Sequence, residues 1–207
     1  AFSRRLLLFG EMMDIEEKKE NLRELYEQYE RDVAELKKAA ACEAGCADCC
    51  IGVGDIDITT MEGVVIRERV ATFDRSIQAE IKAGLAQNKA EREQGKLSRC
   101  AFLKGDKTCM IYDIRPFSCR KLYSVKRCNG APPTIHRQAV NLARQTVNEM
   151  QRLDFGGYSG HISYILYLLA KEDFRRRYLH GKSDPQKIVD FGRSHGIVIN
   201  RFVSPCR

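Results

Sequence analysis

The sequence predicts a mainly α-helical domain whose helices are joined by irregular, cysteine-rich loops. Long stretches without proline carry apolar residues at three- and four-residue intervals, the period of an amphipathic helix. The segments between them hold eight of the nine cysteines. Only the stretch GIVINRFV, near the C-terminus, has an extended pattern. A chain of 207 residues is long enough to bury one sizeable core, so one domain is expected.

The first long helix is predicted over residues 11–41. This stretch lacks proline and glycine, and Leu22, Tyr26, Tyr29, Val33 and Leu36 recur on one face. A helix of this length extends about 45 Å, enough to cross a small domain or to meet a partner helix.

A second helical stretch is predicted from Thr59 to about Glu93. Thr59 precedes Glu62 by three residues, which is the spacing of a capping box. Gly63 and Gly84 are expected to bend or divide the helix. Residues 96–130 then form loops.

Helical pattern returns at residues 134–153 and, after the break DFGGYSG, at residues 159–179, with Ser159 or Ser163 as the cap. A last short helix is expected behind Ser183, with Pro185 in an early position. The chain is therefore divided into a long helix (1–41), a cysteine-rich region (42–130) and a C-terminal helical part of the same domain (131–207).

The cysteines fall into two groups. The first has the pattern CxxxCxxCC, the second is spread over a later loop segment, and an odd ninth cysteine, Cys206, is expected to take no part. An odd number of cysteines without a secretory signal argues against a disulfide framework, so we expect metal-bound thiols in the reducing cytoplasm. The predicted metal ligands are Cys42, Cys46, Cys49, Cys50, Cys100, Cys109, Cys119 and Cys128, of which Cys128 is either an eighth ligand or a free thiol.

Thiolates two or three residues apart can converge on one metal, and the second group would close the site from a distant part of the chain. The all-thiolate set suits both zinc and an iron–sulfur cluster, and the CxxxCxxC spacing slightly favours the cluster. Neighbouring Cys49 and Cys50 are expected to point in different directions, so that they serve different metals or one of them does not bind the metal directly. Eight cysteines could hold one centre or two.

The segments CEAGCADCC, DIDITTMEGVVI and CAFLKGDKTCMIYDIRPFSCR together resemble the zinc- or iron-chelating domain family of YkgJ-type cysteine-cluster proteins. The resemblance covers residues 42–120 and places seven of the cysteines, all but Cys128, at family positions. Arg115 with Pro116, and Arg120, fill its R-P and C-R positions. The resemblance implies metal chelation and identifies no substrate.

The formal charge of +7 is concentrated partly around the second cysteine group. We expect these cations to neutralise an anionic metal centre, with Arg115 and Arg120 as cofactor-binding residues. Nucleic-acid binding is not expected, because specific motifs are missing. The longest apolar run, Ile162 to Ala170, is about half of a bilayer span, so a membrane segment is not expected either. The cations near the second cysteine group, mentioned above, are Arg115, Arg120, Lys121, Lys126 and Arg127.

The leading functional hypothesis is a redox or metal-dependent modifying component of unknown substrate. The alternative is a structural zinc module that binds a protein partner through the N-terminal helix. CxxxCxxC is also the spacing of radical S-adenosylmethionine enzymes, but Asp48 stands where an aromatic residue is usual and the βα alternation of a barrel is missing. Of the four histidines, His161 is the one to test as a ligand.

Overall fold

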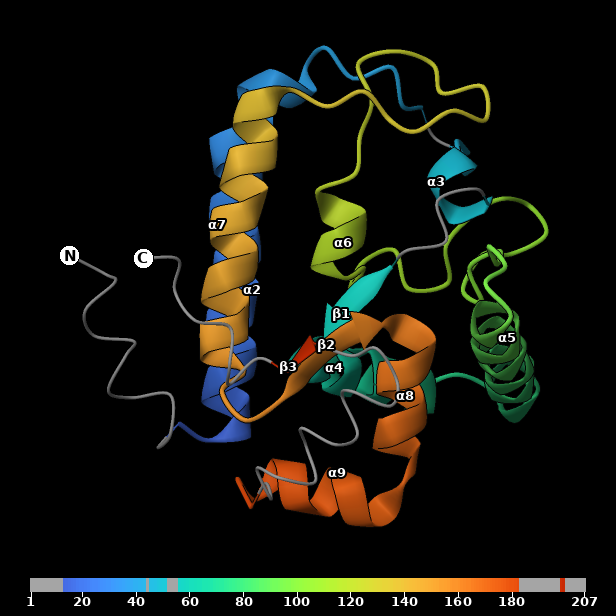
Figure 1. Ribbon diagram of the computed structural model, residues 1–207, viewed down its shortest axis with the longest axis vertical. Coiled ribbons are helices and arrows are strands. Elements are labelled where there is room, and N and C mark those ends of the chain that lie inside the picture. The colour runs from blue at the N-terminus through green and yellow to red at the C-terminus, as the bar shows by residue number, and fades with distance from the viewer. Residues whose placement is uncertain (1–12, 44, 52–55, 183–197, 200–207) are drawn as a thin grey trace.

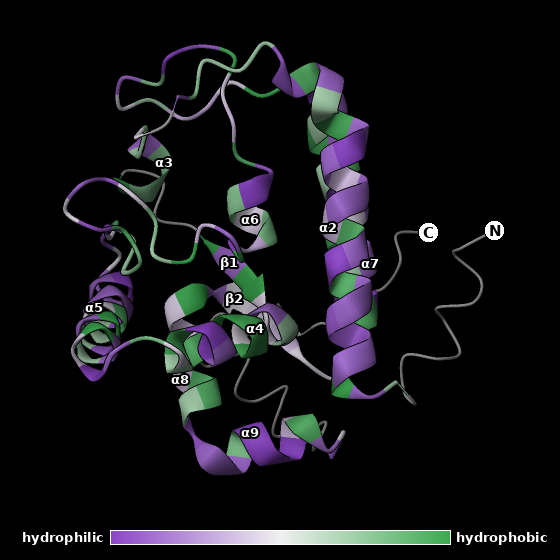
Figure 2. Ribbon diagram, turned by 180° about the vertical axis from the view of Figure 1, so that it is seen from behind, coloured by the Kyte–Doolittle hydropathy of each residue, from purple (hydrophilic) through white to green (hydrophobic). Residues whose placement is uncertain are grey.

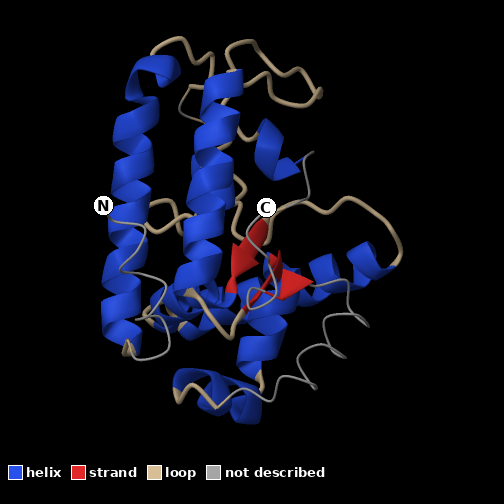
Figure 3. Ribbon diagram, turned by 60° about the vertical axis from the view of Figure 1, so that its left-hand side comes forward, coloured by secondary structure: helices blue, strands red, loops and turns tan. Residues whose placement is uncertain are grey.

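The computed structural model describes residues 13–43, 45–51, 56–182 and 198–199, and within these ranges the chain is mainly helical, as predicted. The N-terminal twelve residues, the helix predicted behind Ser183 and Cys206 lie outside the described residues. Figures 1 and 3 show the helices around a small central sheet. The elements are α2 (Ile15–Lys37), α3 (Asp48–Ile51), β1 (Asp57–Thr59), α4 (Thr60–Ala71), α5 (Arg75–Glu93), α6 (Phe117–Arg120), α7 (Arg137–Leu153), β2 (Tyr158–His161), α8 (Ile162–Ala170), α9 (Glu172–Leu179) and β3 (Val198–Ile199).

Helix α2 is the predicted N-terminal helix, and it is capped by Asp14, whose carboxylate accepts a hydrogen bond from the Glu17 N–H at 2.9 Å. It runs alongside α7 (Figure 1), with Leu22, Tyr29 and Val33 buried. Figure 2 shows that the outward faces of both helices are largely hydrophilic. The apolar face of α2 is thus covered within the same chain. Binding of a protein partner through this helix stays a prediction.

The central sheet has three antiparallel strands in the order β1-β2-β3. Asp57 pairs with His161 and Thr59 with Ser159. Strand β3 lies in the stretch that the sequence pattern predicts as extended, whereas β1 and β2 were not predicted. None of the helices among the described residues combines the length and the apolar character needed to cross a bilayer.

The predicted capping box at the start of α4 is confirmed: the Glu62 N–H donates to Thr59 Oγ1 at 3.2 Å, and the Thr59 N–H donates to Glu62 Oε2 at 2.7 Å. The expected division at Gly63 or Gly84 is wrong, because the break between α4 and α5 falls at residues 72–74, where Asp74 is the N-cap. Gly63 instead allows close packing on α8: a Cβ there would lie 2.6 Å from Leu169 Cδ1.

The predicted helix over residues 159–179 is two helices, α8 and α9, separated at Lys171. The cap of α8 is His161, and neither Ser159 nor Ser163 takes that role; the His161 side chain accepts a hydrogen bond from the Ser163 N–H. Sequence reasoning missed this because it assigned Ser159–His161 to the helix, and these residues belong to β2.

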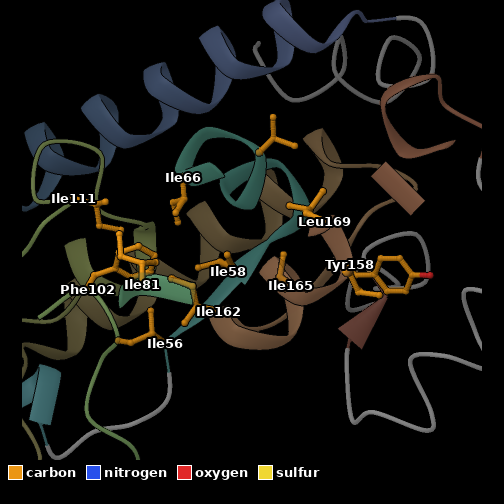
Figure 4. Close-up of a cluster of buried hydrophobic side chains, with 12 residues drawn as sticks. Ile56, Ile58, Ile66, Ile81, Phe102, Ile111, Tyr158, Ile162, Ile165 and Leu169 are labelled. Atoms are coloured by element: carbon orange, nitrogen blue, oxygen red, sulfur yellow. The ribbon is translucent and has the colours of Figure 1, made fainter. Parts of the chain in front are cut away.

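A buried cluster at the centre of the molecule joins the sheet to the cysteine-rich loops (Figure 4). Ile58 of β1, Ile66 of α4 and Ile165 of α8 are almost fully buried in it. Phe102 and Ile111, from the loop segment that contains Cys100 and Cys109, are packed into the same cluster. The hydrophobic effect therefore anchors the second cysteine group to the helical core. The helices themselves were predictable; this anchoring was not.

Candidate metal centre

Three loop segments that are distant in the sequence lie near one another: the loops that follow α2 and α6 run side by side at the top of Figure 1, and the loop between α5 and α6 passes beside α3. The Ala41 N–H donates to the carbonyl oxygen of Ser124 at 2.7 Å, and the Cys100 N–H donates to the carbonyl oxygen of Cys50 at 2.8 Å. These two backbone hydrogen bonds connect the first cysteine group to both later segments. We call the described parts of residues 38–51 and 99–136 the thiol loops.

All eight cysteines of the thiol loops are free thiols, and most are half-buried. Among the described residues, no three or more His, Cys, Asp or Glu side chains already form a ligand shell for one metal ion. The eight predicted ligands are nonetheless brought into one region, where the charge on one thiolate raises the pKa of another.

The mutual influence of the thiols divides them into two groups. Burial raises the pKa of Cys42, and the charges of Cys46, Cys128 and Cys49 raise it further. We call Cys42, Cys46 and Cys128 the outer group; the Ser124 N–H also donates to Cys42 Sγ at 3.3 Å. Cys128, which lies outside the quoted family motif, is thereby placed near the first motif.

The inner group comprises Cys50, Cys100, Cys109 and Cys119. Burial raises the pKa of the Cys100 thiol to about 11, and it also raises the pKa of Cys109 and Cys119. The charges of Cys100 and Cys109 add to the effect at Cys119. Ionising several of these thiols together is costly unless a bound cation compensates the charge, which is what a metal ion does for its thiolate ligands.

Cys50 of the inner group has Cys49, which belongs to neither group, as its neighbour on α3. Their side chains are hydrogen-bonded to each other, which lowers the pKa of Cys49 and raises that of Cys50. The two thiols are thus in contact with each other, and the expectation that they serve different metals stays a prediction. Cys49 acts electrostatically on both the outer and the inner group.

Two arginines predicted to bind the cofactor border the inner group and also hold its loop. Arg120 Nε donates to the carbonyl oxygen of Arg115 at 2.8 Å, and its guanidinium lies 4.6 Å from the centre of the Tyr26 ring. Arg115 lies 4.4 Å from the centre of the Tyr112 ring, and its charge acts against burial to lower the pKa of Cys109. Arg120 thus bridges two backbone carbonyls of this loop, since its guanidinium also donates to the carbonyl oxygen of Asp113 at 3.3 Å.

The other predicted cations have varied positions. Arg127 forms an exposed ion pair with Glu43 at 3.1 Å. Lys121 lines a cavity together with Phe117 and Ser118 of α6. His161, singled out as a candidate ligand, is hydrogen-bonded through Nδ1 to Ser163 Oγ at 2.7 Å. It lies at the end of β2 and is not a member of either thiol group.

Sequence reasoning missed two residues that act on the thiols. Ser124 supplies the N–H to Cys42, and Arg99 lowers the pKa of Cys100 against the larger effect of burial while donating to the carbonyl oxygen of Lys104 at 2.8 Å. Arg99 directly precedes Cys100, so a search for cations adjacent to cysteines could have found it. No sequence signal connects Ser124 with Cys42.

Comparison with known proteins identifies the family. Residues 41–149, more than half of the chain, match the family model CxxCxxCC, described as "Putative zinc- or iron-chelating domain". No significant match to a curated protein or to a solved structure was found. The matched residues contain all eight cysteines of the thiol loops, together with α4, α5, α6 and most of α7. The chain therefore belongs to the CxxCxxCC family of zinc- or iron-chelating domains.

Proposed function

We propose that the thiol loops bind zinc or an iron–sulfur cluster through cysteine thiolates from both cysteine groups. The observation that carries this proposal is the gathering of eight free thiols from distant segments into one region, within a chain whose family model is described as a zinc- or iron-chelating domain. The donor set fits, because soft thiolates are the preferred ligands of both zinc and iron–sulfur clusters. Arg115 and Arg120 would hold the inner loop and supply positive charge beside the anionic centre.

We further propose two centres. The outer group together with Cys49 provides four thiols, and the inner group provides another four. The support is electrostatic: Cys42 is influenced by Cys46 and Cys128, whereas Cys50 is influenced by Cys100 and Cys119. Cys49 acts on both groups, and we assign it to the outer centre because the outer group has only three thiols of its own. Four thiolates complete the coordination of one zinc ion or one cubane cluster. A cytoplasmic location would keep these thiols reduced.

A bound iron–sulfur cluster would supply one-electron transfer, and the chain would then act as a redox or modifying component. Bound zinc would instead clamp the thiol loops to the helices. In either case Phe102 and Ile111 already pack one loop against the core, and a bound metal would complete that attachment.

Purification without oxygen, followed by elemental analysis and visible absorption, tests the proposal. One expected result is two zinc ions per chain and a colourless protein. The other is iron with acid-labile sulfide and a broad absorption at about 400 nm, typical of thiolate-bound clusters. One metal centre per chain would contradict the division into two groups. Folded protein without zinc and without iron would contradict the proposed function altogether.

A further inference from the structure

Helix α6 carries Cys119 of the inner group in a single turn. It has four residues, Phe117–Arg120, and a helix this short is not stable without contacts from the rest of the chain. The position of the Cys119 thiol therefore depends on what holds α6. The contacts at the two ends of this helix come from α4 and α2.

Charged side chains of these two longer helices hold the ends of α6. At its start, the N–H of Phe117 donates to Glu62 Oε1 of α4 at 2.7 Å. At its end, the carbonyl oxygen of Arg120 accepts a hydrogen bond from Lys37 Nζ of α2 at 3.1 Å. The first N–H groups and the last carbonyl groups of a helix have no partner within it, so these hydrogen bonds satisfy both ends.

The ammonium group of Lys37 is itself held by several neighbours. It lies 2.6 Å from Glu30 Oε2, which is on the same helix. It also lies 5.5 Å from the centre of the Tyr29 ring and 5.9 Å from the centre of the Tyr123 ring, and both rings are buried. Lys37 is only 22% exposed. Its contact with α6 is therefore made by a partly buried group with a defined position, unlike that of a lysine at the surface.

The carboxylate of Glu30 connects this lysine to the segment that precedes α6. Glu30 Oε1 lies 3.9 Å from the guanidinium of Arg115, while Glu30 Oε2 pairs with Lys37. Arg115 comes four residues before Cys119 in the sequence, and Arg120 comes one residue after it. Helix α2 thus contacts the chain on both sides of Cys119.

We propose that Lys37 is a positioning residue for Cys119: by holding the carbonyl oxygen of Arg120, it fixes the single turn that carries this thiol and so favours metal binding by the inner group. The part concerning metal rests on the proposed function. Lys37 and Glu30 precede residues 41–149, which match the family model, so the match assigns neither of them a role.

Amide hydrogen exchange in the metal-free full chain tests the positioning of α6. The N–H groups of Cys119 and Lys121 donate within this turn, to the carbonyl oxygens of Pro116 and Phe117, each at 2.9 Å. In Lys37→Met we expect these two amides to exchange at least about tenfold faster, because a hydrogen bond from a charged group is lost. The amides of α5 should keep their protection, which shows that the variant is folded.

Two further variants separate the role of Lys37 from a general effect of mutation. Lys37→Arg should restore slow exchange, because a guanidinium can also donate to Glu30 and to the carbonyl oxygen of Arg120. Lys38→Met is the matched control, because Lys38 is the next residue, is exposed and forms an ion pair with Glu35 at 2.8 Å. It should exchange like the unaltered chain.

Zinc titration of the same four proteins, in competition with a chelator of known affinity, measures the consequence for metal binding. We expect Lys37→Met to weaken the binding of one of two zinc ions about tenfold, the size of effect seen when a group that orients metal ligands is lost. The other zinc ion, held by the outer group, should bind as before. Lys37→Arg and Lys38→Met should match the unaltered chain.

Three results would overturn the proposal: equal exchange of the α6 amides in Lys37→Met and the unaltered chain, equal zinc affinities of these two proteins, or the same losses in Lys38→Met. If the unaltered chain bound no zinc and no iron, the proposed metal function would fail. The exchange of the metal-free proteins would still decide whether Lys37 positions Cys119, so the two failures are distinguishable.

Discussion

Helix α6 joins two regions that are held together in different ways. On one side, the helical region of α2, α4, α7 and α8 is fixed by buried apolar side chains and by the carboxylates of Glu62 and Asp154, each satisfied by several donors. On the other side, the described part of the thiol loops contains α3, a helix of four residues, and no further helix besides α6 itself. Most of its thiols are half-buried, and burial raises the pKa of Cys100 and Cys119. The helical region is thus held by apolar packing and hydrogen bonds, whereas the thiol loops carry the thiols that we propose to bind a metal ion.

The largest effect is expected at Glu62, which connects the two regions. Glu62→Ala would leave the Tyr26 hydroxyl and the N–H groups of Thr59 and Phe117 without their acceptor. Because each buried unsatisfied donor costs about 1–3 kcal/mol, we expect the free energy of unfolding to fall by about 5 kcal/mol. Urea unfolding followed by circular dichroism measures this.

Glu68→Ala is the matched control, because Glu68 lies on the same helix and is exposed, with an ion pair to Lys19. We expect a change below about 1 kcal/mol. Equal losses for both variants would show that Glu62 does not hold the two regions together.

The buried carboxyl group of Asp154 should make the stability of the helical region depend on pH. Burial raises its pKa from 3.8 to about 7, although Tyr178 and the Met61 N–H donate to its carboxylate. Because the folded-state pKa is raised, this group's stabilising contribution is present below about pH 4 and is lost as the pH rises through about 7. The loss amounts to at most about 4 kcal/mol.

Asp154→Asn should remove this dependence. The free energy of unfolding of the unaltered chain, compared with that of the variant, should be highest at pH 4. It should fall relative to the variant as the pH rises to 7. Measuring both proteins at each pH cancels the contribution of Glu62, whose pKa is also raised by burial. A difference that stays constant over this range would contradict the prediction.

Removal of the metal should affect the thiol loops and the helical region differently. After chelation we expect faster amide hydrogen exchange in the thiol loops, because their backbone has few hydrogen bonds of regular structure. The amides of α2 and α7 should keep their protection, since these helices are packed against each other. Uniform loss of protection would mean that the metal stabilises the whole domain and not the loops alone.

The smallest effect concerns the ion pair between Lys19 on α2 and Glu68 on α4, with an N–O distance of 3.0 Å. Lys19→Met should lower the free energy of unfolding by less than about 1 kcal/mol, and the difference should shrink with added salt. A loss as large as that of Glu62→Ala would contradict the view that buried groups hold the helical region.

Local signals explain which elements the sequence could predict. The apolar period of α2 and the capping box of Thr59 and Glu62 are contained in a few neighbouring residues, and both are confirmed. Strands β1 and β2 are three and four residues long, too short to show an alternating pattern. The break before α5 has no glycine or proline; Asp74, a favourable N-cap residue, was its available signal.

The candidate site was predictable as a set of residues, because CxxxCxxCC is rare in a globular chain, but its arrangement was not. The proximity of Cys128 to Cys42 depends on the Ala41–Ser124 hydrogen bond, which joins residues more than eighty positions apart. The hydrogen bond from Lys37 to the carbonyl oxygen of Arg120 also joins distant residues and has no motif. Such long-range placement follows from packing and is not encoded in local spacing.

The central claim is that thiols from both cysteine groups hold the metal. Its most direct test is the metal content of the full chain carrying Cys100→Ser, Cys109→Ser and Cys119→Ser together, purified without oxygen and compared with the unaltered chain. The account predicts loss of the inner centre, and therefore about half of the bound metal, while all four cysteines of the CxxxCxxCC motif remain. Unchanged metal content would show that the first motif binds metal alone, and would contradict the account.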